Sequence, residues 1–314
     1  MSLPYFDAAQ VRARAPWCAA VDALAAALRD DVDPEQDGPR VFSPAPGGEF
    51  LLMPASGARY SGVKALTVAP GNPARGLEKI QGVYVLCSSD TLAPVALLDG
   101  TELTAIRTPA VTLLAVTRIL AATPGGAPEA PRVLVFGAGV QALNHLRAAH
   151  ALLPGARLGV VGRSEDRVRV LVETLAAEGV DVEARSAADV DTADVILCAT
   201  TSTTPLFDGA AVAPDAVVAA VGQHGLDARE VDAALVRRSD VVVEGRASAL
   251  REAGDLIPAR SAEEWQRIRP ANLRDLVVDG IARTPGKPCL YAGVGMAWED
   301  LVTAAMVYEG GTIP

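Results

Sequence analysis

The 314-residue sequence has few aromatic residues, at 4%, and few cysteines. The four cysteines are far apart in the chain, at Cys18, Cys87, Cys198 and Cys289. No Cys-x-x-Cys pair or Cys/His cluster occurs, so the sequence predicts neither a metal site nor a redox dithiol. Scattered cysteines in an acidic chain are typical of a reducing compartment, and we expect a cytoplasmic protein.

Basic residues are also in the minority. The chain has 28 Lys and Arg against 38 Asp and Glu, a formal net charge of −10. Nucleic acids and anionic membranes bind basic surfaces, so neither is an expected partner. No uncharged apolar run reaches the ~18 residues of a membrane span. The first 16 residues lack the basic start and apolar run of a signal peptide.

Half of the residues are hydrophobic, enough for a sizeable core, and the length suggests two domains. The first third of the chain is predicted to contain both helices and strands, in a mixed α+β arrangement. Its pattern predicts a helix over 17–28, strands over 40–43, 49–53, 59–68, 82–87 and 95–98, and a long helix from about 99 or 101 to 122. The Pro/Gly-rich stretch 123–131 is predicted to be a linker and is the best candidate for the domain boundary.

Beyond the linker, strands alternate with helices. Strands are expected over 133–136, 158–161, 180–184, 195–199, 217–221 and 241–243, with helices over 141–152 and 165–178. This alternation predicts an α/β fold with a Rossmann-type, doubly wound parallel sheet. The chain ends in a strand, a glycine turn and a final helix.

A nucleotide-binding fingerprint follows the strand over 133–136. The run Gly137-Ala138-Gly139-Val140-Gln141-Ala142 has the form G-x-G-x-x-A and opens a helix. The first Gly permits a tight turn, and the second lets backbone N–H groups approach a pyrophosphate at the helix N-terminus. The surrounding strand–turn–helix–strand pattern favours dinucleotide binding over a plain turn.

The end of the next strand bears on the choice of cofactor. NAD sites usually place an acid there, but this chain has Gly162, followed by Arg163 and Ser164. No carboxylate would repel a 2′-phosphate, and both following side chains can donate to one. NADP(H) is therefore favoured, with NAD(H) as the alternative. In the simpler interpretation Arg163 is solvated and Ser164 caps the next helix.

The chain resembles the ornithine cyclodeaminase/mu-crystallin family. The resemblance covers residues 40–308 and is most specific in the LDGT-x-LTA-x-RT run together with GAG-x-QA. The matching segments are LLMPAS (51–56), SGVKALTVAPGN (61–72), ALLDGTELTAIRT (96–108), FGAGVQA (136–142), CATTSTTPLF (198–207), AVGQHGLDAREVD (220–232), AGDLIP (253–258) and VGMAWEDLVTAA (294–305).

The resemblance implies an architecture. Residues 1–115 with 292–314 would form an α+β substrate-binding and dimerisation domain that the C-terminal helix completes, and 116–291 the Rossmann domain. Members are usually homodimers built on the N-terminal sheet, with substrate in the cleft between the domains.

Cofactor contacts are expected from Thr108, Gly137, Gly139, Val140, Gln141, Arg163, Ser164, Thr200, Thr201, Ser202, Gly222, Gly295 and Met296.

Three cationic residues are candidates for binding the substrate or transferring a proton to it. Arg107, two turns into its helix, offers a planar fork for a substrate carboxylate, and Arg40 is a second candidate. Both match the family's carboxylate-binding arginines. Lys64 matches its active-site lysine, although a lysine within a strand more often points to solvent. Burial beside arginines would lower the pKa of Lys64 and suit it to proton transfer.

Two positions depart from the cyclodeaminase pattern. Leu51, with Met53 a predicted substrate contact, replaces an acid that would hold the distal ammonium of ornithine. His224 replaces an Asp and is a candidate proton donor, or else an ordinary loop histidine. His145 and His150, on the first Rossmann helix, are expected to be structural.

These observations favour an NAD(P)H-dependent oxidoreductase acting at the Cα–N bond of a small amino or imino acid. It would be a ketimine or cyclic-imine reductase, or an amino-acid dehydrogenase. Two alternatives stay open: a cyclodeaminase-type lyase that makes proline from ornithine, and a non-catalytic NADPH-dependent binding protein.

Overall fold

The computed structural model describes residues 3–222 and 225–310. The chain forms two compact units, Met1–Arg107 with Met296–Pro314, and Thr108–Gly295. The Pro/Gly-rich stretch 123–131 joins a helix to a strand within the second unit.

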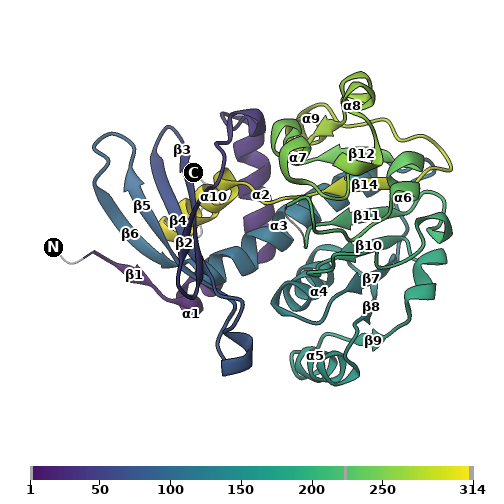
Figure 1. Cartoon of the computed structure of the whole chain (residues 1–314), viewed down its shortest axis with the longest axis horizontal. Coiled ribbons are helices and arrows are strands. Elements are labelled where there is room, and N and C mark those ends of the chain that lie inside the picture. Colours follow the sequence, from purple (N-terminus) through teal and green to yellow (C-terminus); the bar gives the residue numbers. More distant parts are fainter. Residues whose placement is uncertain (1–2, 223–224, 311–314) are drawn as a thin grey trace. The chain divides into compact units, whose positions relative to one another are not determined.

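The first unit is built on a six-stranded sheet in the order β1-β6-β5-β4-β3-β2 (Figure 1). Only the β1–β6 pair is parallel, and the other neighbours are antiparallel. The strands are β1 (Tyr5–Phe6), β2 (Val41–Ala45), β3 (Gly48–Ser56), β4 (Tyr60–Val68), β5 (Ile80–Ser88) and β6 (Pro94–Asp99).

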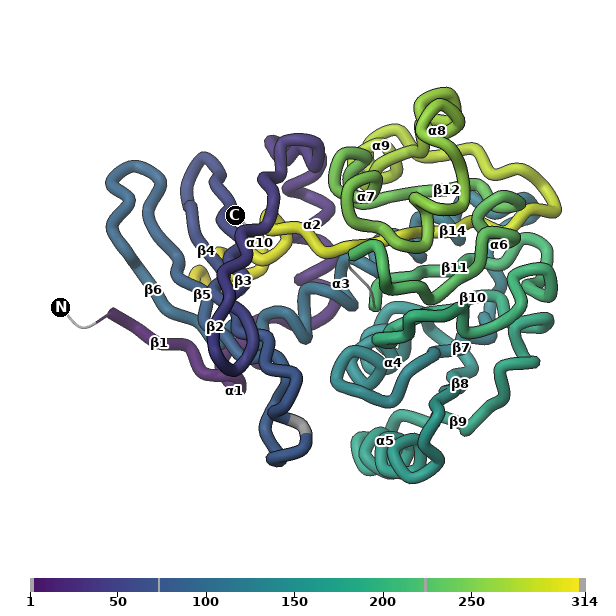
Figure 2. Tube along the Cα trace, viewed as in Figure 1, coloured from purple at the N-terminus to yellow at the C-terminus, as the bar shows by residue number. Residues whose placement is uncertain are grey.

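The helices of this unit come from both ends of the chain. They are α1 (Ala8–Arg14), α2 (Trp17–Arg29) and α10 (Ala297–Tyr308), with short 3-10 turns at Pro34–Gln36 and Pro73–Arg75. Helix α10 packs on α2 and against β3, β4 and β5, so the yellow α10 and the purple α2, far apart in the sequence, lie side by side in Figure 2. The expected completion of this domain by the last helix is confirmed.

The second unit has an eight-stranded, all-parallel sheet in the order β13-β12-β14-β11-β10-β7-β8-β9 (Figure 1). From β7 the chain adds β8 and β9 on one side and then returns to add β10 and β11 on the other. This is the reversal of a doubly wound sheet. The strands are β7 (Arg132–Phe136), β8 (Arg157–Val161), β9 (Val182–Ala184), β10 (Val195–Cys198), β11 (Val217–Ala220), β12 (Asp240–Val243), β13 (Ala271–Asn272) and β14 (Cys289–Ala292).

The remaining helices are α3 (Gly100–Ala121), α4 (Val140–Leu152), α5 (Glu165–Ala177), α6 (Ala233–Arg238), α7 (Arg246–Glu252), α8 (Ala262–Ile268) and α9 (Leu273–Val278), with 3-10 turns at Ala187–Asp191, Gly209–Ala211 and Ile257–Ala259. Alternate residues of the central strands, among them Phe136, Ile196 and Val218, pack with Leu235 and Trp265 into one buried cluster. The predicted fold class is confirmed.

Helix α3 runs through the unit boundary, with residues 100–107 in the first unit and 108–121 in the second. It is long and apolar enough to cross a membrane, yet 78% of its apolar 18-residue stretch is buried inside the protein. This burial is typical of the core helix of a soluble protein. Asp99 accepts a hydrogen bond from the Glu102 N–H at 2.8 Å, which explains where the helix begins.

Candidate active site

Four buried charges meet in the first unit. The Lys64 Nζ lies 2.7 Å from Asp300 Oδ2, and Arg107 Nε donates to Asp300 Oδ1 at 3.0 Å. Arg107 Nη1 donates to Glu299 Oε2 at 2.6 Å. Lys64 and both carboxylates are fully buried, and the Arg107 side chain is 6% exposed. The structure therefore brings together the two cations that the sequence singled out and joins them through Asp300.

Strand register places Lys64 on the buried face of the sheet. Lys64 pairs with Met53 of β3, and Leu66, two residues on, pairs with Leu51. Residues two apart on a strand share a face. Leu51 and Met53 are 3% exposed and pack with Leu66 and Ala297 into a small apolar cluster. The expectation that a strand lysine points to solvent does not apply here, because α10 covers this face and supplies a carboxylate.

The start of α10 is fixed by the segment that leads to Arg40. The Asp37 carboxylate accepts hydrogen bonds from the Ala297 and Trp298 N–H groups at 3.2 and 3.1 Å. These are two of the N–H groups that a helix leaves without an internal partner. The contact ties the approach to β2 to the helix that carries Glu299 and Asp300.

Burial is the main cause that lowers the pKa of Lys64 from 10.5 to about 8. The positive charge of Arg107 lowers the pKa further, Asp300 raises it, and Arg40 lowers it again. The lowering expected from burial and neighbouring arginines is confirmed. Both protonation states of this amine are accessible near neutral pH, as a group that transfers protons requires.

Tyr84 is a neighbour of this cluster that the sequence did not reveal. It pairs with Lys64 across β4 and β5 and is fully buried. Its ring lies where a side chain at Gly62 would be, since a Cβ there would meet the Tyr84 hydroxyl at 2.6 Å. Burial raises the pKa of Tyr84 well above its usual value, so the phenol stays neutral.

The fingerprint turn of the second unit has the geometry of a pyrophosphate cradle. Gly137 has φ 125°, and a Cβ there would lie 2.6 Å from the Ala199 carbonyl. Gly139 begins α4 with no side-chain cap, and only an arginine tip lies near a Cβ built there, at 3.8 Å. Helix α4 thus begins without a side chain that caps its N-terminus, as a helix terminus that binds an anion requires. The half-buried Gln141 and exposed Val140 form the first turn.

The end of β8 gives a steric reason for the missing acid. A Cβ at Gly162 would meet Val168 Cγ2 at 2.7 Å and the Ala138 Cβ at 3.2 Å. Arg163 is exposed, and its guanidinium has no ion-pair partner in the part of the chain that the structure describes. Ser164 is the N-cap of α5 and accepts from the Arg167 N–H at 3.4 Å. The capping role considered for Ser164 is therefore real, and its hydroxyl can still donate elsewhere.

Buried glutamates hold the loops at the carboxyl edge of this sheet. Glu230 accepts hydrogen bonds from Thr200 after β10 and from the Gly222 N–H after β11. Glu244, at the end of β12, accepts from the Val294 and Gly295 N–H groups at 2.8 and 2.7 Å. Thr200, Gly222 and Gly295, all expected cofactor contacts, are thus fixed by carboxylates that the sequence did not single out.

The other expected residues lie on the same segments. Thr201 and Ser202 continue the loop after β10, Thr201 exposed and Ser202 half-buried. Met296 is buried at the N-cap of α10, and Thr108 lies within α3. His224, the candidate proton donor, lies outside the described residues.

His145 has the structural role expected of it. Its ring is fully buried between α4 and α3, with Nδ1 2.8 Å from the Gln141 carbonyl and Nε2 3.1 Å from Thr112 Oγ1. Burial lowers the pKa of His145 to about 4, so it is neutral at physiological pH. His150 is exposed further along α4.

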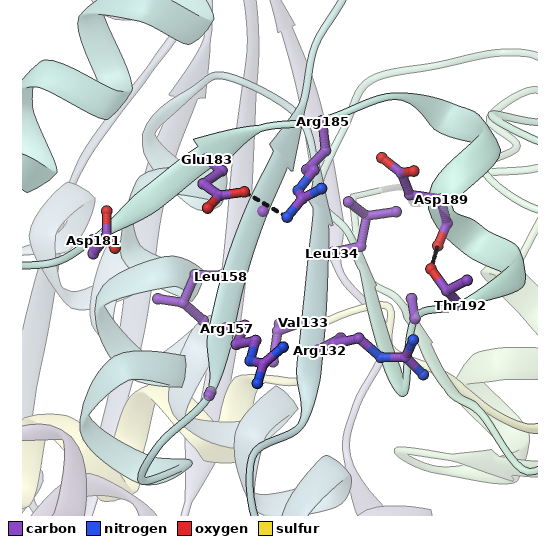
Figure 3. A pocket seen from close by; sticks show the side chains of 13 residues that line it. Arg132, Val133, Leu134, Arg157, Leu158, Asp181, Glu183, Arg185, Asp189 and Thr192 are labelled. Atoms are coloured by element: carbon purple, nitrogen blue, oxygen red, sulfur yellow. Dashed lines mark hydrogen bonds and ion pairs between the residues drawn. The ribbon is translucent and has the colours of Figure 1, made fainter.

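A hollow of about 500 Å³ lies over the first residues of β7 and β8 and beside β9 (Figure 3). Two of its three arginines are held by ion pairs: Arg185 pairs with Glu183 at 2.5 Å, and Arg132 with Asp194 at 3.1 Å. Dinucleotides bind at the carboxyl ends of parallel strands, and this hollow lies towards the amino ends. It is therefore separate from the cofactor loops.

Sequence reasoning missed Glu299 and Asp300, although both lie in the matched segment 294–305. A signal was available: two adjacent acids stand in a helix whose other residues are mostly apolar. A helix whose residues are mostly apolar is buried, and buried carboxylates need cationic partners. The predicted cations Lys64 and Arg107 were the obvious ones.

The model of the family described as "Ornithine cyclodeaminase/mu-crystallin family" matches residues 7–312 of this chain. The chain belongs to this family. Among curated relatives, Δ1-pyrroline-2-carboxylate reductase 1 of Burkholderia multivorans is 38% identical over 304 residues, covering 95% of this chain and 93% of the relative.

Solved structures agree with the family fold. The Δ1-pyrroline-2-carboxylate reductase of Thermococcus litoralis, in complex with NADH and L-proline, superimposes with a TM-score of 0.84 at 23% identity, covering 98% of this chain and 97% of that one. An archaeal alanine dehydrogenase dimer with bound NAD has a TM-score of 0.84 at 22% identity, with coverages of 99% and 96%. At these identities the likeness concerns the fold.

Proposed function

We propose that this family member is an NAD(P)H-dependent imine reductase that converts Δ1-pyrroline-2-carboxylate into proline. The observation that carries the proposal is the buried cluster of Lys64 and Arg107 with Asp300. It occurs in a chain 38% identical to a reductase of that substrate. The bound cofactor supplies the hydride, and the residues of this chain bind, orient and protonate the substrate.

The charge of the cluster suits a monoanionic imino acid. Lys64 and Arg107 are balanced by Asp300 and Glu299, and the field of Arg40, which also acts on Lys64, adds one positive charge. A carboxylate removed from water needs such a cationic partner. We assign carboxylate binding to Arg40 and Arg107, with Leu51 and Met53 as the apolar wall for the ring carbons.

Lys64 is the proposed proton donor to the imine nitrogen. With a pKa of about 8 it is mostly protonated at neutral pH and is acidic enough to release its proton. Asp300 holds the ammonium in place through Nζ. His224 stays a second candidate donor on sequence grounds.

The apolar surroundings of Leu51 argue against ornithine cyclisation. A distal ammonium beside Leu51, Met53 and Leu66 would be buried without a partner, at a cost of several kcal/mol. A compact apolar ring suits this cluster better. The cyclodeaminase alternative therefore ranks below the reductase, and the retention of Lys64, Arg40 and Arg107 places the pure-binding alternative below it as well.

NADP(H) is the proposed preference, with NAD(H) as the alternative. It is supported by Gly162, which leaves no acid for the ribose, and by the exposed Arg163 beside it. We further propose a cytoplasmic homodimer. Exposed Val41, Phe42 and Phe50 on β2 and β3 give the first sheet an apolar edge suited to a second copy.

The function is tested by following NADPH and NADH oxidation with Δ1-pyrroline-2-carboxylate, Δ1-piperideine-2-carboxylate, and pyruvate plus ammonia. Turnover of the cyclic imines, lost in Lys64→Met with cofactor binding intact, supports the proposal. Incubation with ornithine and catalytic NAD(P) is the parallel test, and formation of proline there would favour the cyclodeaminase. No turnover of any imino acid by cofactor-loaded protein would rule the reductase out.

A further inference from the structure

One carboxylate joins two loops at the carboxyl edge of the parallel sheet. Glu230 Oε1 accepts from the Thr200 N–H at 2.6 Å and from Thr200 Oγ1 at 2.8 Å, and its Oε2 accepts from the Gly222 N–H at 2.8 Å. The two loops are in close contact, since a Cβ at Gly222 would lie 2.2 Å from the Thr200 carbonyl oxygen. Glu230 is fully buried.

The segment that carries Glu230 is itself held on both sides. Asp255, 1% exposed, accepts from the Glu230 and Val231 N–H groups at 2.8 and 3.0 Å through one oxygen. The flanking main chain pairs with the loop after β10, through Arg229 N–H to the Ser202 carbonyl and Leu206 N–H to the Glu230 carbonyl, both at 2.9 Å. Glu230 therefore has a fixed position from which it holds the loops.

The place of this arrangement in the sheet indicates its use. The fingerprint turn after β7 and the end of β8 receive the adenosine half of a dinucleotide, and β10 and β11 lie on the other side of β7. The loops that Glu230 joins thus follow the strands of the nicotinamide half. A donor or acceptor that is held in place before the ligand arrives contributes more to binding, because less conformational freedom is lost when the ligand binds.

We propose that Glu230 is a positioning residue that holds the loops after β10 and β11 in the arrangement that receives the nicotinamide end of the cofactor. The inference rests on the proposed dinucleotide-dependent function. Glu230 acts through Thr200 and Gly222, by accepting three hydrogen bonds at once. A glutamine could accept fewer, because its NH2 group would face an N–H or hydroxyl donor.

Because Glu230 accepts three hydrogen bonds, its contacts with the two loops depend on whether its carboxyl group is ionised. Burial raises the pKa of Glu230 to about 7, the hydrogen bonds from Thr200 and Gly222 lower it, and the negative charge of Asp255 is a smaller cause that raises it. Cys198 on β10 is the other titratable neighbour, and its pKa is raised well above its usual value. A protonated Glu230 turns one acceptor into a donor and releases one of the three bonds. Cofactor affinity should therefore fall as the pH drops through about 7.

The test is fluorescence titration of the whole protein with NADH, which lacks a titrating 2′-phosphate, between pH 6 and pH 8.5. We expect Glu230→Gln to bind NADH about tenfold more weakly at pH 8 and to lose the dependence on pH. Asp240→Asn is the matched control, because Asp240 accepts from the Thr284 N–H and hydroxyl at the opposite edge of the sheet. Asp240→Asn should keep the wild-type affinity and pH profile.

Wild-type affinity and pH dependence in Glu230→Gln would overturn the inference, whatever the outcome of the turnover assays. If Glu230→Gln does not fold, amide exchange in the wild type decides. The Thr200 and Gly222 amides should be protected at pH 8 and lose protection below pH 7, after correction for intrinsic exchange rates. Exchange unprotected at pH 8 overturns the inference. Failure of the wild type to bind either dinucleotide would instead reject the proposed function.

Discussion

Asp300→Asn is the sharpest perturbation of the proposed proton donor. It keeps the shape of the side chain and removes the charge that lies 2.7 Å from the Lys64 ammonium. Two unit charges with centres about 4 Å apart interact by roughly 4 kcal/mol at an effective dielectric constant of about 20, which corresponds to roughly 3 pKa units. The pKa of Lys64, about 8 in the wild type, should fall by that amount, because burial and Arg107 act in the same direction.

The expected kinetic result is a shift of the pH profile. At pH 7.5 the protonated fraction of Lys64 falls by about two orders of magnitude, and kcat/KM for the imino acid should fall with it. Activity should recover as the pH is lowered, because the alkaline limb of the kcat/KM profile moves from near pH 8 towards acid. Initial rates of NADPH oxidation between pH 4.5 and pH 9.5 measure this limb.

Glu299→Gln is the matched control, because Glu299 accepts from Arg107 Nη1 at 2.6 Å, whereas Asp300 is the carboxylate 2.7 Å from the Lys64 Nζ. It should raise KM for the imino acid and leave the alkaline limb near pH 8. Breaking a buried ion pair typically costs about 3–5 kcal/mol of stability, so thermal unfolding of both variants has to be measured alongside. If folded Asp300→Asn keeps its alkaline limb where the wild type has it, Lys64 is not the group that titrates.

Three further predictions concern other sites. Arg107→Lys should raise KM for the imino acid at least about tenfold in steady-state assays, because a point charge cannot reach both Glu299 and Asp300 as the guanidinium does; an unchanged KM would remove Arg107 from the carboxylate site. Arg163→Ala should weaken NADPH binding about tenfold and leave NADH binding unchanged in parallel titrations, and equal losses for both would contradict a 2′-phosphate contact. The pKa of His145, about 4 in the folded state against 6.5, means that the wild type should lose about 3 kcal/mol of stability as the pH falls from 6.5 to 4. In urea unfolding at pH 7 and pH 4.5, His145→Gln should lack this loss.

Local pattern was sufficient for the elements and the cofactor turn. Apolar runs bounded by Gly and Pro predicted most strands of both sheets, and G-x-G-x-x-A predicted the turn at Gly137. The predicted elements differ from the structure by one to three residues at their ends, where end residues of several types fit either state. The pattern did not predict the short elements β1, β13, α1 and α6 to α9, because segments of two to seven residues are too short to show a period. These signals are local, so one sequence contains them.

The contact partners of the functional residues could not be predicted from local sequence patterns. Lys64 and Asp300 are more than 200 positions apart, and nothing in the spacing of a strand indicates which helix will cover it. The hydrogen bonds from Thr200 and Gly222 to Glu230 likewise depend on two loops that meet only when β10 and β11 pair.

From the sequence alone one obtains the fold class and the dinucleotide turn, because periodicity and glycine are properties of short segments, and the family resemblance singles out three cations suited to an organic acid. Only the tertiary structure shows that Asp300 joins Lys64 to Arg107, that burial brings the pKa of Lys64 near 8, and that steric crowding excludes a side chain at Gly162. Each of these depends on desolvation and on contacts between distant segments, and both arise when the chain packs.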